Sequence, residues 1–360
     1  MPSGRAGNRR ATALPDAVDE TPWMRGAIVS ADDDQTNGTG IVASQFGLTL
    51  SSEEHGPRRL VDLAALAEDH GFDFVSSSDH FHPWIDAQGH SPFVWAVLGA
   101  IAERTTTIGV VVGVTCPTTR IHPAVLAQAA ATCAQLLEGR FTWGVGSGEA
   151  LNEHILGDRW PPADVRLEML EEAIAVIRRL WTGDTITHRG IHYTVENARL
   201  YDPPDRPVPI VVSAFGPQAT EVAARAGDGL WMTGPDADTV TRWRDAGGEG
   251  PVYGQLTLCW ANDRDDAVKT AHRIWPNSGV PGQLSQDLAT PAHFEQAVSN
   301  VTPEMVAQSV PCGPDPEPIL ARIDEMVRAG VDHLYLHQIG PDQEGFCTFW
   351  SNAIRPAVSA

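Results

Sequence analysis

Residues 71–84 read GFDFVSSSDHFHPW, a short apolar run that leads directly into a group of chemically active side chains. The apolar half is typical of a buried parallel strand, which is covered on both faces. Asp79, His80 and Trp84 then follow the strand end together, and Pro83 stops the strand from continuing. Folds that alternate strands and helices keep their chemistry at the carboxyl ends of the strands. This stretch therefore predicts an α/β fold with a site at that end.

The same alternation of strand and helix runs along most of the chain. The expected strands are residues 41–50, 72–77, 107–114, 141–146, 209–213, 229–232, 252–259 and 333–337. Helices are expected at 57–71, 92–103, 123–137 and 169–180, and the first three of these ranges begin with a proline. Eight strands with intervening helices predict a single (β/α)8 TIM barrel over residues 41–358. A doubly wound sheet is the alternative, but no G-x-G-x-x-G opens a helix at the first turn.

Three segments fall outside this regular pattern. Residues 1–40 are polar and are expected to form a disordered or mobile tail. Residues 185–200 alternate around Arg189-Gly190, which predicts a hairpin insertion. Residues 276–318 are long, rich in proline and poorly periodic, and such a stretch in a compact domain predicts a lid or a substrate wall.

Composition and targeting signals narrow the class of protein. The net charge of −21 over 360 residues opposes nucleic-acid binding, which requires basic patches. No run reaches the roughly 18 apolar residues of a membrane span. Arg9-Arg10 resembles a twin-arginine signal, but no apolar segment follows, so a cytoplasmic location is expected. The five cysteines are widely spread and include no C-x-x-C pair, so no metal is expected.

Four successive strand ends carry polar residues that a barrel would gather at one mouth. Glu53 follows the first strand, His80 the second, Cys116 the third and Glu149 the fourth. Two carboxyls and an imidazole can serve as general acid and base. The alternatives are acids at helix starts for Glu53 and Glu149, and a structural histidine for His80. The turn 213–217 after the fifth strand has small residues whose backbone N–H groups are free for a phosphate.

Residues 78–84, 114–118, 146–153 and 226–229 together resemble the luciferase-like hydride-transfer flavoenzymes. They are most similar to the branch with deazaflavin-dependent glucose-6-phosphate dehydrogenase and hydroxymycolic acid dehydrogenase, over about residues 42–358. The resemblance implies a (β/α)8 barrel that holds coenzyme F420, a 5-deazaflavin, at the carboxyl end of its strands. It also implies a non-proline cis peptide in a bulge at Gly113-Val114, behind the deazaflavin ring.

The resemblance also implies roles for single residues. His80 would take the hydroxyl proton of the substrate, with Glu53 as a rival base, and Glu149 would supply a proton to the deazaflavin ring. Trp84 would shape the site and polarise the developing charge. The implied cofactor-binding residues are Asp79, Gly113, Val114, Cys116, Ser147, Gly148, Ala214, Phe215 and Gly216. A homodimer is expected from the resemblance alone.

One departure from the family concerns the substrate. The sugar-phosphate dehydrogenase binds its phosphate with two lysines and an arginine, and the matching places here are Asp236, Gln296 and Ser309. A phosphate without a cation loses charge-assisted hydrogen bonds. Trp84 and Trp231 are expected to line a wider apolar pocket instead, and most other tryptophans are expected in the core.

The favoured hypothesis is an F420-dependent dehydrogenase acting on a neutral or lipophilic alcohol, or on a non-phosphorylated sugar-like hydroxyl. The alternatives are an F420-dependent glucose-6-phosphate dehydrogenase, an FMN-dependent luciferase-like monooxygenase and a barrel that binds a ligand without turnover. The last has no need for an acid and a base at one mouth.

Overall fold

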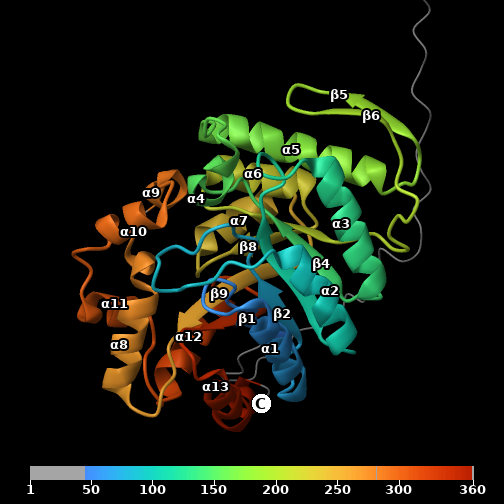
Figure 1. Cartoon of the computed structure of the whole chain (residues 1–360). Coiled ribbons are helices and arrows are strands. Elements are labelled where there is room, and N and C mark those ends of the chain that lie inside the picture. Colours follow the sequence, from blue (N-terminus) through green and yellow to red (C-terminus); the bar gives the residue numbers. More distant parts are fainter. Residues whose placement is uncertain (1–44, 281, 359–360) are drawn as a thin grey trace, which may run out of the picture. The chain divides into compact units, whose positions relative to one another are not determined.

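The computed structural model describes residues 45–280 and 282–358, and eight parallel strands in it close into a barrel (Figure 1). Around the barrel the strands follow the order β1-β10-β9-β8-β7-β4-β3-β2, and β2 pairs again with β1. The predicted (β/α)8 class is confirmed. The strands are β1 (Gln45–Leu50), β2 (Phe74–Ser77), β3 (Gly109–Thr115), β4 (Phe141–Val145), β7 (Ile210–Ser213), β8 (Gly229–Met232), β9 (Val252–Leu258) and β10 (His333–Gln338).

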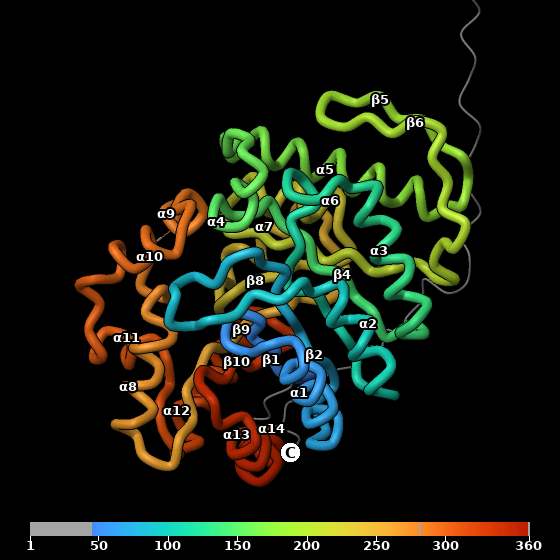
Figure 2. The backbone as a smooth tube through the Cα atoms, in the orientation of Figure 1, coloured from blue at the N-terminus to red at the C-terminus, as the bar shows by residue number. Residues whose placement is uncertain are grey.

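Helices connect successive strands and lie on the outside of the barrel, as the tube in Figure 2 shows. The apolar side of each helix packs against the barrel. The outer face of the strands is thereby buried, as is usual for parallel sheets. Outside the segment between α8 and α12, these helices are α1 (Pro57–Asp69), α2 (Val94–Arg104), α3 (Pro123–Leu136), α5 (Ala163–Leu180), α6 (Pro217–Ala226), α7 (Ala237–Asp245), α8 (Arg264–Ile274), α12 (Glu317–Arg328) and α13 (Gln343–Phe349). The chain then continues through a π-helical turn (Trp350–Ile354) and α14 (Arg355–Val358).

Aromatic side chains fill the barrel interior. The Trp231 ring stacks between Tyr335, with ring centroids 4.2 Å apart, and Tyr253, at 5.2 Å. Gly113 makes room for it, because a Cβ at that position would overlap the indole. The interior is therefore a packed core, and the open mouth at the carboxyl ends of the strands is left for a site.

The segment between α8 and α12 has more structure than its sequence pattern indicates. It forms a 3-10 turn (Pro276–Gly279) and three short helices, α9 (Leu284–Asp287), α10 (Pro291–Ala297) and α11 (Pro303–Ser309). Thr290 caps α10 and Thr302 caps α11, and a proline follows each threonine at the first helical position. The Thr-Pro pairs were therefore the signal for these helices, since cap chemistry marks a helix too short to show a hydrophobic period.

The start of α5 differs from the sequence-based expectation, and the start of the expected first strand lies outside the described residues. Helix α5 begins at Ala163 rather than Met169, because its first turns carry charged residues such as Arg166 that apolar periodicity does not detect. The expected tail, with the first four residues of the expected first strand, lies outside the described residues. Strands β5 (Ile186–Arg189) and β6 (Thr194–Ala198) form an antiparallel hairpin beside α5.

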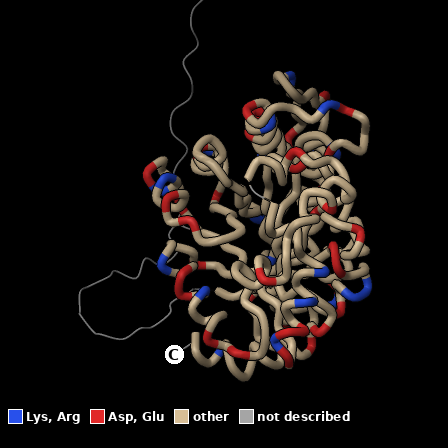
Figure 3. Tube along the Cα trace, turned by 90° about the vertical axis from the view of Figure 1, so that its left-hand side faces the viewer, with Lys and Arg blue, Asp and Glu red and all other residues tan. Residues whose placement is uncertain are grey.

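The charged residues are spread along the described part of the chain. In Figure 3 the Lys and Arg positions form short, separated stretches along the trace, with Asp and Glu between them. None of the helices in the described ranges combines the length and the apolar character needed to cross a bilayer.

Candidate active site

A buried acid–imidazole pair lies at the mouth of the barrel. His80 follows β2 and Glu53 follows β1, and the His80 Nδ1 atom lies 2.9 Å from Glu53 Oε1. Their side chains are 9 % and 4 % exposed. The Ser78 hydroxyl donates to the same Glu53 oxygen at 2.7 Å, and the Ser51 hydroxyl donates to Oε2 at 3.2 Å. Two neighbouring strand ends thus hold one carboxylate in a fixed orientation toward the imidazole.

The pair shifts the pKa values of both groups. Burial alone would raise the pKa of Glu53, but the facing His80 and the Ser78 hydroxyl outweigh it and lower the pKa from 4.5 to about 2. Burial alone would lower the pKa of His80, but the charge of Glu53 outweighs it and raises the pKa above 6.5, with smaller contributions from Glu149 and Asp79. The ion pair therefore stabilises the fold fully between pH 4.5 and pH 6.5, the ordinary pKa values of the two side chains. Its contribution is lost as pH rises through the raised His80 value or falls toward about 2.

Glu54, the next residue, serves a different part of the mouth. Its Oε1 lies 3.2 Å from Nε2 of His337 on β10, and its Oε2 accepts the Gly340 N–H at 2.8 Å. These contacts tie the loop after β1 to the end of β10. They fix the residue that follows Glu53.

Asp79 belongs to a second buried charge cluster that joins three successive strand ends. The Arg120 Nη2 atom donates to Asp79 Oδ1 at 2.8 Å and to the Asp79 carbonyl at 3.0 Å. The backbone N–H of Arg120 donates to Glu153 at 2.7 Å. Burial raises the pKa of Glu153 to about 7, although Arg120 opposes the shift. The second oxygen of Asp79, Oδ2, is buried and has no partner among the described residues.

Asn152 fastens the loop that carries the active residues. Its side-chain oxygen accepts the backbone N–H groups of Phe81 and His82, at 2.9 and 3.1 Å. The His82 ring also contacts the Leu151 carbonyl at 2.9 Å. The loop after β2 is therefore anchored to α4 (Ala150–Glu153), which follows β4. Arg120 and Asn152 were not predicted as site residues, because their partners lie tens of residues away in the sequence.

Beside these clusters the mouth opens into a cavity of about 720 Å³. Its walls come from the loops after β2, β3 and β4, the start of α5, the turn from β7 to α6, and α9 with the residues before it. Among its lining residues only Glu149 and Arg166 are charged. The predicted site residues that line it are Trp84, Val114, Ser147, Gly148, Glu149, Phe215 and Gly216.

The wall formed by β3 contains the expected backbone irregularity. The Gly113-Val114 peptide is cis, and the pairing of β3 with β4 shifts register between Val112 and Thr115. Val114 faces the cavity, while Gly113 faces the barrel interior. Cys116 is buried behind Gly148, whose missing Cβ leaves room for its sulfur, and is not among the lining residues.

Trp84 connects the imidazole to the apolar side of the mouth. Its ring lies edge-on to His80, with centroids 5.1 Å apart, and edge-on to Phe294 of α10, also at 5.1 Å. Val280 and Leu288 pack against the same cluster. Residues between β9 and β10 therefore contribute an apolar wall next to the acid–imidazole pair.

Ten predicted site residues are not among those that line the cavity. Five of them were placed above: Glu53, Asp79, His80, Gly113 and Cys116. The other five belong to the barrel core or to exposed segments. Trp231 is 2 % exposed in the barrel core, which corrects its expected place in the substrate pocket. Ala214 is also buried. Asp236 caps α7 by accepting the Thr239 N–H at 2.9 Å, and Gln296 and Ser309 lie on exposed faces of short helices. Local capping and strand packing, which a loose alignment does not detect, account for these positions.

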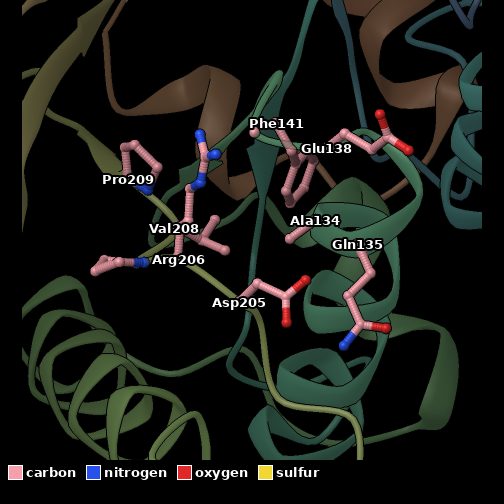
Figure 4. A pocket seen from close by; sticks show the side chains of 10 residues that line it. Ala134, Gln135, Glu138, Phe141, Asp205, Arg206, Val208 and Pro209 are labelled. Atoms are coloured by element: carbon pink, nitrogen blue, oxygen red, sulfur yellow. The ribbon is translucent and has the colours of Figure 1, made fainter.

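A second cavity, of about 450 Å³, lies at the amino end of β4 and β7. Figure 4 shows Glu138 and Gln135 on one side of it and Asp205 and Arg206 on the other. No imidazole lines it, and the amino ends of barrel strands support stability rather than chemistry. Within the described ranges, no three His, Cys, Asp or Glu side chains are grouped as metal ligands would be.

Comparison with known sequences identifies close relatives of the chain. Residues 38–333 match the family model described as luciferase-like monooxygenase. An F420-dependent glucose-6-phosphate dehydrogenase of Microbacterium testaceum is 35 % identical over 330 residues, which cover 87 % of this chain and 97 % of the relative. A protein of the same description from Amycolatopsis mediterranei is 36 % identical and covers 88 % and 99 %.

Among solved structures, one similar protein acts on a different class of substrate. An F420-dependent secondary alcohol dehydrogenase, in complex with an F420-acetone adduct, has a TM-score of 0.81 and 30 % identity, covering 87 % of this chain and 98 % of its own. A coenzyme F420-dependent tetrahydromethanopterin reductase from Methanopyrus kandleri has a TM-score of 0.67 and 20 % identity, a likeness that shows the fold alone.

Proposed function

The chain belongs to the luciferase-like monooxygenase family, and on that premise we propose that it is a coenzyme F420-dependent oxidoreductase. The reaction we propose is hydride transfer between an alcohol carbon and the deazaflavin. The observation that carries the proposal is the buried His80–Glu53 pair, which lies against Trp84 of the cavity wall. Removing hydride from an alcohol requires a base at the hydroxyl, and this pair supplies one.

The residues around the cavity fit a deazaflavin. Asp79 Oδ2 has no partner among the described residues, so it is free to accept a hydrogen bond from a polar ring edge. Gly146 and Gly148 leave the backbone bare along the same wall, where a planar ligand can approach closely. Val114 would support the ring from the bulge. When bound, the deazaflavin supplies the carbon that exchanges hydride with the substrate.

The residues of this chain would handle the protons of the reaction. His80 takes the proton from the substrate hydroxyl as the hydride leaves, and Glu53 stabilises the imidazolium that results. Glu149 lines the cavity and supplies a proton on the cofactor side, with Asn152 Nδ2 3.5 Å from its Oε2. Trp84, edge-on to His80, excludes water from the reacting side and contacts the substrate.

The electrostatics of the mouth favour a neutral or lipophilic alcohol, or a sugar-like hydroxyl without phosphate. Of the residues that the structure describes, Arg166 is the only cation that lines the cavity. Asp236, Gln296 and Ser309, which match the phosphate-binding places of the sugar-phosphate enzymes, are exposed and offer no cation. The wall of Trp84, Val280 and Phe294 buries apolar surface, at about 25 cal/mol per Å² of favourable free energy.

Relatives at 35 % identity favour glucose 6-phosphate as the second candidate substrate. A bleaching assay separates the two. We expect the absorbance of oxidised F420 to fall when purified protein is mixed with a panel of secondary and primary alcohols, but not with glucose 6-phosphate. Parallel mixtures with FMN and oxygen test the monooxygenase alternative by oxygen consumption. Rapid bleaching by the sugar phosphate would contradict the substrate class and leave the cofactor assignment intact.

The pH profile distinguishes the two candidate bases. With His80 as base, log kcat/KM for alcohol oxidation should rise with pH at a slope of one and level off at a pH above 6.5, because Glu53 raises the pKa of the imidazole. In Glu53→Gln the profile should level off at a lower pH, since burial then acts without the opposing charge. A flat profile from pH 5 to 8 in the wild type would instead indicate Glu53, whose pKa is about 2, as the base.

A homodimer and a cytoplasmic location stay predictions. Light scattering of the purified protein tests the first, and fractionation of the source cells tests the second.

A further inference from the structure

The side chain of Gln88 joins the loop that follows β2 to the end of α8, where the segment of the apolar wall begins. It is 5 % exposed. Its Oε1 accepts the backbone N–H of Trp84 at 2.8 Å and that of Ile85 at 3.5 Å. Its Nε2 donates to the Ile274 carbonyl at 3.0 Å and to Asn277 Oδ1 at 3.3 Å. These bonds form the Gln88 bridge, which uses both polar atoms of the amide.

The bridge satisfies two backbone groups that their own segments leave without a partner in a helix or strand. The Trp84 N–H follows Pro83 in an irregular loop. The Ile274 carbonyl belongs to the last turn of α8, where helix carbonyls have no intrahelical partner. Buried backbone groups need a partner, and a carboxamide can donate and accept at once, whereas a carboxylate can only accept. The residue type at position 88 therefore matches both segments.

Two other contacts join the same segments, but they fix the distance between them less firmly. The Trp84 ring lies edge-on to Phe294 of α10, with centroids 5.1 Å apart. The backbone N–H of Asp86 donates to Glu295 Oε1 at 3.2 Å, in a bond exposed to water. Exposed bonds compete with water, and ring contacts have little directional preference, so the buried Gln88 bridge is the main constraint.

The loop that contains Gln88 connects the apolar wall to the acid–imidazole pair. It starts at Trp84, whose ring lies edge-on to His80. It ends at His90, whose N–H donates to the Glu53 carbonyl at 2.9 Å. The rest of the cavity is lined mainly by the loops after β3, β4 and β7. A change at Gln88 would therefore alter the substrate side of the mouth and leave those loops in place.

We propose that Gln88 is a positioning residue that fixes Trp84 against the apolar wall and so decides how bulky an alcohol the site accepts. Val280, Leu288 and Phe294 form this wall. The inference rests on the proposed function, because it requires an alcohol bound beside the wall. Dispersion contacts depend steeply on distance, and a gap of about 0.5–1 Å already loses about a quarter to a half of the attraction.

Steady-state kinetics with a small and a bulky alcohol test this role. Gln88→Glu keeps the size of the side chain and the acceptor for the Trp84 N–H, but it removes both donated bonds. The KM for cyclohexanol should rise about tenfold, while the KM for isopropanol stays within about twofold, because only the larger alcohol reaches the wall. The Kd of F420, measured by fluorescence titration, should not change. A merely structural residue would lower stability without separating the two KM values.

A second variant and a matched control guard against a general loss of structure. Gln88→Leu removes all bonds of the amide without adding a charge, and the same separation of KM values is expected. Gln135→Glu breaks a comparable bond, from Gln135 Nε2 to the Pro203 carbonyl at 2.8 Å, at the amino end of the barrel. This control should lower the melting temperature, followed by circular dichroism, but leave both KM values unchanged.

Hydrogen exchange of the free protein tests the bridge without cofactor or substrate. In both Gln88 variants the amides from Trp84 to position 88 and those of the 3-10 turn Pro276–Gly279 should exchange faster, because the two segments are no longer joined. The amides of α3 should exchange as in the wild type.

The other results overturn different parts of the inference. Equal changes in KM for the two alcohols would overturn the role of Gln88 in specificity, and unchanged exchange would overturn the bridge itself. Wild-type protein that binds F420 but oxidises neither alcohol would overturn the substrate class. Wild-type protein that binds no F420 would overturn the proposed function, and hydrogen exchange would still decide whether Gln88 joins the two segments.

Discussion

His80→Ala is expected to lower kcat for alcohol oxidation by about 10²- to 10⁴-fold, the usual contribution of a positioned general base. The variant should still bind the deazaflavin, because the cavity wall is built from other residues. Glu53 would remain buried but would lose the contact at 2.9 Å that orients the imidazole. Stopped-flow bleaching of F420 gives the rate, and fluorescence titration gives the affinity.

A nearby histidine serves as the control for this variant. His82→Ala removes an imidazole from the same loop but keeps the backbone bond to Asn152 that anchors it. Most of the activity should remain in that variant. If His80→Ala oxidised alcohols as fast as the wild type, the base would have to be Glu53 or a group outside this pair.

Arg120→Leu is expected to lower the free energy of unfolding by about 3–5 kcal/mol at pH 8, the cost of breaking a buried ion pair from one side. The carboxylates of Asp79 and Glu153 would both remain buried without their cation. Glu153 has a raised pKa of about 7, so stability already falls with rising pH between 4.5 and 7. The loss in the variant should be smaller at pH 6, where Glu153 takes up a proton. Urea unfolding at both values of pH measures it.

Two further variants test whether this loss of stability comes from the buried charges. Arg225→Leu breaks an exposed pair with Glu171 and should cost no more than about 1 kcal/mol. Adding Glu153→Leu to Arg120→Leu should restore part of the stability, since one of the two orphaned charges is then absent. Equal unfolding free energies for Arg120→Leu and wild type would show that the cluster is not a structural ion pair. A folded Arg120→Leu should also bind F420 more weakly, because nothing then orients Asp79.

Local pattern was sufficient to predict the barrel. Short apolar runs, separated by helices of which several begin with a proline, identified all eight strands, because strands buried on both faces are apolar in sequence as well. The hairpin of β5 and β6 was visible in the same way from alternation around a turn. The short helices α10 and α11 and the first turns of α5 were missed, because caps and charges rather than periodicity define them.

The residues of the site were predicted where the chemistry follows a strand directly. His80, Glu53 and Glu149 are polar residues placed straight after apolar strands, and the barrel topology alone predicts that such residues meet. Trp231 was placed wrongly, since the sequence of a strand does not say which level of the barrel interior a side chain fills. Asp236, Gln296 and Ser309 were placed by alignment in segments where capping and exposure decide the local structure.

The sequence by itself determined the class of fold, the mouth where the polar strand ends meet, and the acid and base types gathered there. Those properties depend on hydrophobic pattern and on residue type, which are local. Only the tertiary structure decided that Arg120 lies between Asp79 and Glu153, that Asn152 holds the loop of His80, and that Arg166 of α5 bonds to Gln286 of α9. Ion pairing and burial depend on contacts between segments 30 to 120 residues apart, and no local pattern encodes such distances.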